Sequence, residues 1–291
     1  MPDALSRKPD PDAPAPSPTA GHDDRPIGVF DSGVGGLTVL RHLLRQLPGE
    51  RYVYVADAAR APYGDRPASE VERYSRDIVD YLVGVEDCKL VVVACNTATA
   101  AAAETLRAER PDTPIIGMEP AVKPAAQATR SGVIGVMATA GTIASDKYAA
   151  LLSQYGHGAR VIEDDCAGLV QLIEDGHVDD EAVRARLREI VRPMVAEGAD
   201  VIVLGCTHFP VAEREIRALA GPGVEVIDPA PAVARQVGRV LRECGAAAGE
   251  TRDGPPGREA PRARLLTSGN PAALRAAAAR VLGGEWDVRV W

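Results

Sequence analysis

Two cysteines stand at the ends of two similar stretches of the chain. Residues 91–97 read Val-Val-Val-Ala-Cys-Asn-Thr, and residues 201–208 read Val-Ile-Val-Leu-Gly-Cys-Thr-His. In each stretch a short aliphatic run is typical of a buried parallel strand, and Cys95 or Cys206 follows where the run stops. Ligands of open α/β sheets bind at such strand ends. Two thiols placed there could face one small molecule from opposite sides and move a proton across a carbon atom.

The thiol chemistry has to be weighed against simple packing. A cysteine that closes a buried strand is often only a small apolar residue, but its recurrence in two matching segments favours a chemical role. A free thiol has a pKa of about 8.5, and backbone N–H groups at a helix N-terminus can lower it. Because Thr97 and Pro210 lie where helices could begin, one thiolate could remove a proton while the opposite thiol returns one.

A glycine-rich turn, Asp-Ser-Gly-Val-Gly-Gly at 31–36, follows the first predicted strand. It lacks the G-x-G-x-x-G spacing of a dinucleotide site and the Lys-Ser/Thr of a P-loop. The turn suits a small zwitterion better, because its amides and the Ser32 hydroxyl could bind a carboxylate. Asp31 could bind the ammonium group or take a proton from a neighbouring thiol. A plain turn between strand and helix is the alternative interpretation.

Small polar residues follow each cysteine. Asn96, Thr97 and Thr207 are expected at helix starts, where they would cap the helix and where a carboxylate also binds well. His208 could orient or protonate the second thiol, and a buried structural histidine is the alternative. The pair at 63–64, Tyr63 and Gly64, lies in a loop that could close on the site, although Pro-Tyr-Gly is also common in ordinary turns.

The composition favours an enzyme of two domains. The chain has 291 residues, and its 41 acidic and 33 basic side chains give a formal charge of −8. Because Lys and Arg do not cluster, direct nucleic-acid binding is disfavoured. No apolar run is long enough to span a membrane and the N-terminus lacks an apolar signal segment, so we expect no membrane association and a cytoplasmic location.

The cysteine and lysine positions bear on cofactors. Five cysteines, widely spaced and without a C-x-x-C pair, indicate reduced thiols rather than a disulfide framework or a metal site. Pyridoxal phosphate would need a Schiff-base lysine, and none of the four lysines stands at a matched strand end. The sequence therefore predicts chemistry without a metal or cofactor.

Segments typical of strands and helices alternate along the chain, which predicts an α/β fold with mainly parallel sheets flanked by helices. Ser69, with Glu72 three residues later, is expected to cap a helix that ends near Val85. Besides the two cysteine stretches, strands are expected at 27–30, 52–56, 115–118, 133–137, 160–162, 224–227 and 264–267. The main helices are expected at 37–46, 69–85, 97–110, 145–155, 168–174, 180–197 and 271–282.

An internal repeat relates the two halves. Residues 27–32 align with 134–139 at an offset of 139 − 32 = 107, Cys95 aligns with Cys206 at 206 − 95 = 111, and Glu-Pro-Ala aligns with Asp-Pro-Ala at 228 − 119 = 109. We therefore expect two similar domains related by a pseudo-twofold axis, with the active site in the cleft between them. Thr139 would then lie opposite Ser32.

The repeat also predicts the domain limits. The first domain is expected to comprise residues 26–119 together with 229–291, because the chain would return to it after the second Pro-Ala turn. The second domain would comprise 120–228. The proline-rich residues 1–25 are predicted to be a disordered tail, and residues 245–262 a flexible loop.

Five motifs together resemble those of glutamate racemase, in the aspartate/glutamate racemase superfamily. They are Gly-Val-Phe-Asp-Ser-Gly-Val-Gly-Gly-Leu-Thr at 28–38, Pro-Tyr-Gly at 62–64, Cys-Asn-Thr-Ala-Thr at 95–99, Thr-Ala-Gly-Thr at 139–142 and Gly-Cys-Thr-His-Phe-Pro at 205–210. The resemblance implies a cofactor-independent isomerase that interconverts L- and D-glutamate. It also implies a homodimer and a role in peptidoglycan biosynthesis, and hence in cell wall biogenesis and cell shape.

The resemblance further implies roles for individual residues. Cys95 and Cys206 would be the proton acceptor and donor on opposite faces of the substrate Cα. Asp31 would assist Cys95, His208 would assist Cys206, and Glu174 lies where the family often has a further acid. The implied substrate contacts are Asp31, Ser32, Tyr63, Gly64, Asn96, Thr97, Thr207 and His208, to which the repeat adds Thr139.

Three alternatives stay open at this point. A related racemase could act on aspartate or another amino acid with the same fold and cysteines. A non-catalytic glutamate-binding regulator could keep the site, since some relatives are linked to inhibition of DNA gyrase, although intact cysteines argue against pure binding. A thiol-redox protein is disfavoured because no second cysteine is close in sequence to either strand-end cysteine.

Overall fold

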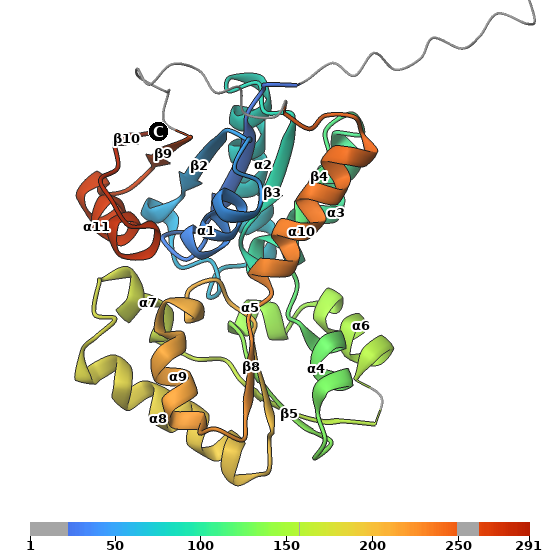
Figure 1. The fold of residues 1–291 in the computed structure, drawn as a ribbon, viewed down its shortest axis with the longest axis vertical. Helices are drawn as coiled ribbons and strands as arrows, with labels where there is room; N and C mark the ends of the chain where they lie inside the picture. Colours follow the sequence, from blue (N-terminus) through green and yellow to red (C-terminus); the bar gives the residue numbers. More distant parts are fainter. Residues whose placement is uncertain (1–22, 157, 249–261) are drawn as a thin grey trace, which may run out of the picture.

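A computed structural model describes residues 23–156, 158–248 and 262–291. Two parallel sheets, each flanked by helices, occupy the upper and lower halves of the molecule (Figure 1). This architecture confirms the predicted α/β fold of two similar domains. Most of the predicted tail over 1–25 and of the predicted loop over 245–262 lies outside the described residues. None of the described helices is both long and apolar enough to cross a membrane.

The first sheet has the strand order β10-β9-β2-β1-β3-β4. Its side chains alternate between two cores, because successive residues of a strand point to opposite faces. Val29 faces the core under α1, whereas Phe30 faces the core under α2 and α3. The strands are β1 (Ile27–Asp31), β2 (Tyr52–Ala56), β3 (Leu90–Val93), β4 (Ile115–Gly117), β9 (Ala263–Thr267) and β10 (Val288–Val290). The helices around them are α1 (Leu37–Gln46), α2 (Ala68–Gly84), α3 (Asn96–Glu109), α10 (Ala230–Glu243) and α11 (Pro271–Leu282).

The second sheet has the order β6-β5-β7-β8. Its strands are β5 (Val133–Met137), β6 (Arg160–Asp164), β7 (Val201–Leu204) and β8 (Glu225–Ile227). Its helices are α4 (Val122–Ala128), α5 (Ala140–Ile143), α6 (Asp146–Tyr155), α7 (Leu169–Glu174), α8 (Glu181–Ala196) and α9 (Glu213–Ala220). Short 3-10 turns follow β2 and β7, at η1 (Ala58–Arg60) and η2 (Phe209–Ala212).

The internal repeat is visible in the strand pairing. In the first sheet β1 pairs with β2 over five residues and with β3 over four, and β3 pairs with β4 over three. In the second sheet β5 pairs with β6 over five residues and with β7 over four, and β7 pairs with β8 over three. The order β2-β1-β3-β4 therefore recurs as β6-β5-β7-β8, and each cysteine follows the third strand of its unit. The domain limits themselves stay a prediction.

Some local expectations were wrong. Helix α2 begins at Ala68 after Pro67, without a side-chain cap, so Ser69 is a helical residue and not the predicted cap. Helix α3 begins one residue early because Cys95 itself caps it. The four-residue α5 and the three-residue edge strand β10 are too short for periodicity to reveal.

A buried ion pair, Lys89 with Glu50, lies just before the first residues of β2 and β3 in the first sheet. The Lys89 ammonium lies 2.7 Å from Glu50, and their side chains are 0% and 6% exposed. Lys89 also donates to the carbonyls of Asp23 and Ala246, at 2.5 and 2.8 Å, and Glu50 accepts from the amide of Ala248 at 2.9 Å. The pair thus ties the segment before β1 and the segment after α10 to one sheet.

We expect Lys89→Met to lower the free energy of unfolding by about 3–5 kcal/mol, because it leaves Glu50 as an uncompensated buried charge. Urea denaturation followed by circular dichroism measures the change. Lys147→Met is the matched control, since Lys147 lies 2.9 Å from Glu119 but both side chains are partly exposed, at 31% and 46%, and such pairs contribute about 1 kcal/mol or less. Equal effects of the two substitutions would contradict the assignment.

Candidate active site

The predicted site residues converge where β1, β3 and β7 end. The Thr207 hydroxyl donates to Asp31 Oδ1 at 3.2 Å, across the boundary between the two sheets. The Thr38 hydroxyl lies 2.9 Å from the Gly35 carbonyl and 3.2 Å from the Thr207 carbonyl. A Cβ atom at Gly35 would lie only 2.5 Å from the His208 ring. The glycine-rich turn therefore packs directly against the segment that carries the second cysteine.

Cys95 is both a buried thiol and a helix cap. Its backbone is extended, and its sulfur accepts a hydrogen bond from the Ala98 amide at 3.5 Å, at the start of α3. The Ser32 hydroxyl lies 4.0 Å from the sulfur. Burial raises the pKa of Cys95, and the negative charge of Asp31 raises it further. The raised pKa therefore keeps Cys95 protonated, as a thiol.

Asp31 holds the turn together. Its Oδ2 accepts from the amides of Gly33 and Gly36, at 3.2 and 2.9 Å, and the side chain is fully buried. Burial raises the pKa of this carboxyl group. Within the described residues Asp31 makes no hydrogen bond to Cys95, and its negative charge contributes to the raised pKa of that thiol. Its predicted assistance to Cys95 stays a prediction.

Cys206, His208 and Glu174 form a second hydrogen-bonded group. Cys206 Sγ lies 3.6 Å from His208 Nδ1, while His208 Nε2 is hydrogen-bonded to Glu174 Oε1. Burial alone would lower the pKa of His208, but its bonds to Cys206 and Glu174 outweigh burial and raise that pKa well above its ordinary value. When protonated, the imidazolium donates to both the sulfur and the carboxylate.

Glu174 reaches this group from α7. Its Oε1 also accepts from the Val34 amide at 2.8 Å, so the carboxylate joins the glycine-rich turn to His208. Burial opposes ionisation, yet the hydrogen bond from His208 keeps the pKa of Glu174 below its ordinary value. Glu174 therefore lies beside His208, and the role that the family resemblance implies for it as a further acid stays a prediction.

The loop at Tyr63 and Gly64 closes on the second domain. The Gly141 amide donates to the Gly64 carbonyl at 3.0 Å, and a Cβ atom at Gly64 would lie 2.8 Å from Thr139 Cβ. Thr139 in turn hydrogen-bonds to the hydroxyls of Thr97 and Thr142, at 2.9 and 3.0 Å. The predicted contacts Thr97 and Thr139 thus meet at the domain boundary. Thr142 is not among the residues predicted from the sequence.

Unpaired polar groups mark the space between these elements. Within the described residues neither atom of the Asn96 side-chain amide has a hydrogen-bond partner, although Asn96 is only 4% exposed. The backbone amides of Gly64, Asn96 and Thr207 likewise donate no hydrogen bond to any residue that the structure describes. Buried donors without partners are costly, and those of Asn96 stand at a helix N-terminus, where anions bind. The arrangement suits a polar, anionic ligand.

The cysteines themselves are nearly enclosed, since Cys95 is 5% exposed and Cys206 is 7% exposed. A groove of about 820 Å³ lies between α3 and α6, and its walls include Thr97 and Gly141 but neither cysteine. Among the described residues, no group of three or more His, Cys, Asp or Glu side chains is placed to hold a metal ion. All five cysteines are free thiols.

Comparison with known proteins identifies the family. Residues 27–237 match the model of the Asp/Glu/hydantoin racemase family. The chain is 49% identical to the glutamate racemase of Roseiflexus sp. over 221 residues, which cover 76% of this chain and 81% of the relative. The structure of a glutamate racemase isoform from Bacillus anthracis aligns with a TM-score of 0.80 and 34% identity, covering 93% of this chain and 98% of that one.

A glutamate racemase from Francisella tularensis, solved in complex with D-glutamate, aligns with a TM-score of 0.77 and 28% identity, covering 92% of this chain and 97% of that one. These matches confirm the resemblance that the five motifs predict. The chain belongs to the Asp/Glu/hydantoin racemase family, among relatives that are glutamate racemases.

Proposed function

We propose that the protein is an amino-acid racemase that interconverts L- and D-glutamate by moving the Cα proton between Cys95 and Cys206. The observation that carries this proposal is the placement of the two thiols at equivalent strand ends of two similar domains, with Cys95 near the Ser32 hydroxyl and Cys206 beside His208. The Roseiflexus and Francisella proteins are glutamate racemases, and the latter was solved with D-glutamate. These relatives support glutamate as the substrate.

In the proposed reaction one cysteine, as a thiolate, takes the Cα proton from one face, and the other, as a thiol, gives a proton to the opposite face. The roles exchange when the other enantiomer reacts. Because its raised pKa keeps Cys95 a thiol, its proton must leave before it serves as base. Asp31, a buried carboxylate whose own pKa is raised, is a suitable acceptor. His208, as an imidazolium, would stabilise the Cys206 thiolate that forms when Cys206 gives its proton to the substrate in the same step.

The substrate would be held by the unpaired polar groups. We propose that the start of α3, through Asn96 and Thr97, binds one carboxylate, because helix N-termini favour anions. Ser32 and the amides of Gly64 and Thr207 would bind the remaining polar groups of the substrate. The Tyr63 hydroxyl donates its single proton to Asp57, so it has no proton left to donate to the substrate. Tyr63 would therefore act by fixing the loop that carries Gly64.

We extend the proposal to the cellular role. The family resemblance supports a homodimer that works in the cytoplasm and supplies D-glutamate for peptidoglycan. Restoration of growth in a bacterial strain that depends on added D-glutamate tests this role. Failure to restore growth by an active, expressed protein would contradict it.

Incubation of purified protein with D-glutamate or L-glutamate in D₂O tests the activity. We expect the optical activity of either enantiomer to decay to zero, with deuterium appearing at Cα. The same assay with D-aspartate tests the nearest alternative substrate. An unchanged signal with glutamate would refute the proposal, and decay with aspartate alone would replace it with aspartate racemisation.

Gly33→Ala is expected to lower kcat/KM for glutamate about tenfold, which corresponds to about 1.4 kcal/mol of transition-state stabilisation. A Cβ atom at Gly33 would lie 1.8 Å from Glu174 Oε1, so the carboxylate would have to leave both Val34 and His208. Gly84→Ala is the control, since nothing lies within 4 Å of a Cβ atom there. Steady-state kinetics of the two variants measure the effect, and matching values would contradict this role of Glu174.

A further inference from the structure

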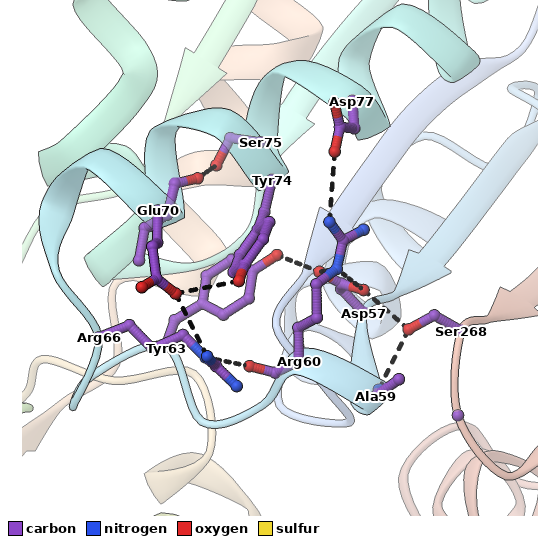
Figure 2. A network of polar contacts seen from close by, with 12 residues as sticks. Asp57, Ala59, Arg60, Tyr63, Arg66, Glu70, Tyr74, Ser75, Asp77 and Ser268 are labelled. Carbon is purple, nitrogen blue, oxygen red and sulfur yellow. Dashed lines mark hydrogen bonds and ion pairs between the residues drawn. The ribbon is translucent and has the colours of Figure 1, made fainter.

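Ser268 joins the C-terminal part of the chain to the loop that carries Tyr63 and Gly64. It lies directly after β9, more than two hundred positions from that loop in the sequence. Its hydroxyl donates to Asp57 Oδ1 at 2.7 Å and accepts from the Ala59 amide at 3.1 Å (Figure 2). Its own amide donates to the Ala56 carbonyl at 3.1 Å. One serine thus holds three positions at and just after the end of β2, namely 56, 57 and 59.

Asp57 is the centre of this network. Its side chain is fully buried and accepts hydrogen bonds from Ser268, from Arg60 Nε at 3.0 Å and from the Tyr63 hydroxyl. Its backbone amide donates to the Asp31 carbonyl at 3.0 Å. Figure 2 shows the three side chains pointing at one carboxylate. The position of Asp57 therefore fixes Tyr63 relative to the turn that carries Asp31.

Tyr63 passes this constraint to Gly64. The phenol is 1% exposed, and its ring packs against Tyr74 with centroids 5.9 Å apart. The Arg60 guanidinium lies over the Tyr74 ring, 4.3 Å from its centre. The next residue, Gly64, accepts the hydrogen bond from Gly141 that closes the loop on the second domain. A shift of Tyr63 would move Gly64 with it.

The turn after β9, which contains Ser268 and Gly269, also packs closely against η1. A Cβ atom at Gly269 would lie 2.8 Å from Ala58 Cβ, so the two backbones are in close contact. Trp291 continues this contact, because its ring lies 5.7 Å from Tyr81 and 5.8 Å from the Arg60 guanidinium. The end of the chain thus braces η1 from one side while Ser268 supplies the directed hydrogen bonds.

We propose that Ser268 is a positioning residue for glutamate racemisation, which acts through Asp57 and Tyr63 to set Gly64 against the substrate. The inference rests on the proposed function. Without the hydroxyl, Asp57 keeps Arg60 and Tyr63 as donors, so the fold is retained. The Ala59 amide loses its acceptor and the carboxylate loses one of three donors, so the loop is free to shift. Small displacements of positioning groups are costly, since about 1 Å can change rates 10²-fold.

Ser268→Ala is expected to raise KM for glutamate about tenfold while kcat falls less than about threefold, because Gly64 binds the substrate and does not transfer its proton. Ser268→Thr keeps the hydroxyl and is expected to restore KM. Ser268→Val, which matches threonine in shape but lacks the hydroxyl, is expected to resemble the alanine variant. If the alanine variant is unstable, the KM of Ser268→Val can be compared with that of Ser268→Thr instead.

Ser75→Ala is the matched control. Its side chain is also buried, and within the part of the chain that the structure describes its hydroxyl bonds only to the Val71 carbonyl of its own helix. Wild-type KM in both Ser268→Ala and Ser268→Val, or an equal rise in KM in Ser75→Ala, would overturn the positioning role. Wild-type protein is measured in the same assay, so that a lack of turnover by it would refute the proposed function and the inference together, whereas unchanged variants beside an active wild type would refute the inference alone.

Discussion

Cys95→Ala is expected to abolish racemisation in both directions, with kcat falling at least about 10²–10⁴-fold, the usual contribution of a positioned acid or base. Cys206→Ala is expected to do the same. Each thiol serves one face of Cα, so neither can replace the other. Racemisation is measured by circular dichroism from each enantiomer. Both variants should fold normally, because among the described residues the sulfur of Cys95 bonds only to Ala98 and Ser32 and that of Cys206 only to His208.

Isotope exchange sharpens this prediction. A variant that keeps one thiol can still remove a proton and return it to the same face, so each single variant should exchange the Cα proton of one enantiomer with D₂O without inverting it. The two variants should select opposite enantiomers. Cys88→Ala is the control, because Cys88 is 3% exposed and packs in the core of the first domain. Retained racemisation in either active-site variant would falsify the two-base mechanism.

Most of the fold could be predicted from the sequence because its strands are short, buried aliphatic runs between clear helix patterns. The internal repeat also predicted that the two domains have similar strands in the same order, because matching turns recur at nearly constant offsets. The start of α2 was predicted wrongly because the pattern of Ser69 and Glu72 satisfied the spacing of a capping box, whereas Pro67 already fixes the entry to the helix. Elements of three or four residues, such as β10, carry no periodic signal.

The site shows where sequence reasoning ends. Cys95, Cys206 and their neighbours follow strands directly, so motif and repeat together locate them. Asp57 follows β2, a strand end like that of Cys95, yet no second motif residue indicates that its carboxylate is turned toward Tyr63. Ser268 lies far along the chain, and only tertiary folding brings it to Asp57. Contacts between segments distant in sequence, without local patterns, could not be predicted.

His208→Asn is expected to lower kcat about 10²-fold, at the lower end of the range for acid-base groups. Cys206 becomes a thiolate when it gives its proton to the substrate, and the His208 imidazolium, bonded to the sulfur and to Glu174, stabilises that charge. Because L- and D-glutamate are equally stable in solution, kcat/KM must fall equally in both directions. The separate values of kcat and KM need not change equally for the two enantiomers. A difference in kcat between L- and D-glutamate would show that the histidine serves one thiol.

The pH profile gives an independent measurement of the same group. The pKa of His208 is raised well above its ordinary value, so the imidazolium persists below that pKa and is lost as the pH rises through it. In Glu174→Gln the imidazolium loses its anionic partner, and its pKa should fall toward the ordinary value. We therefore expect the alkaline decline of kcat to move to lower pH in Glu174→Gln and to vanish in His208→Asn. An alkaline decline that is unmoved in both variants would assign it to another group and leave His208 with an orienting role only.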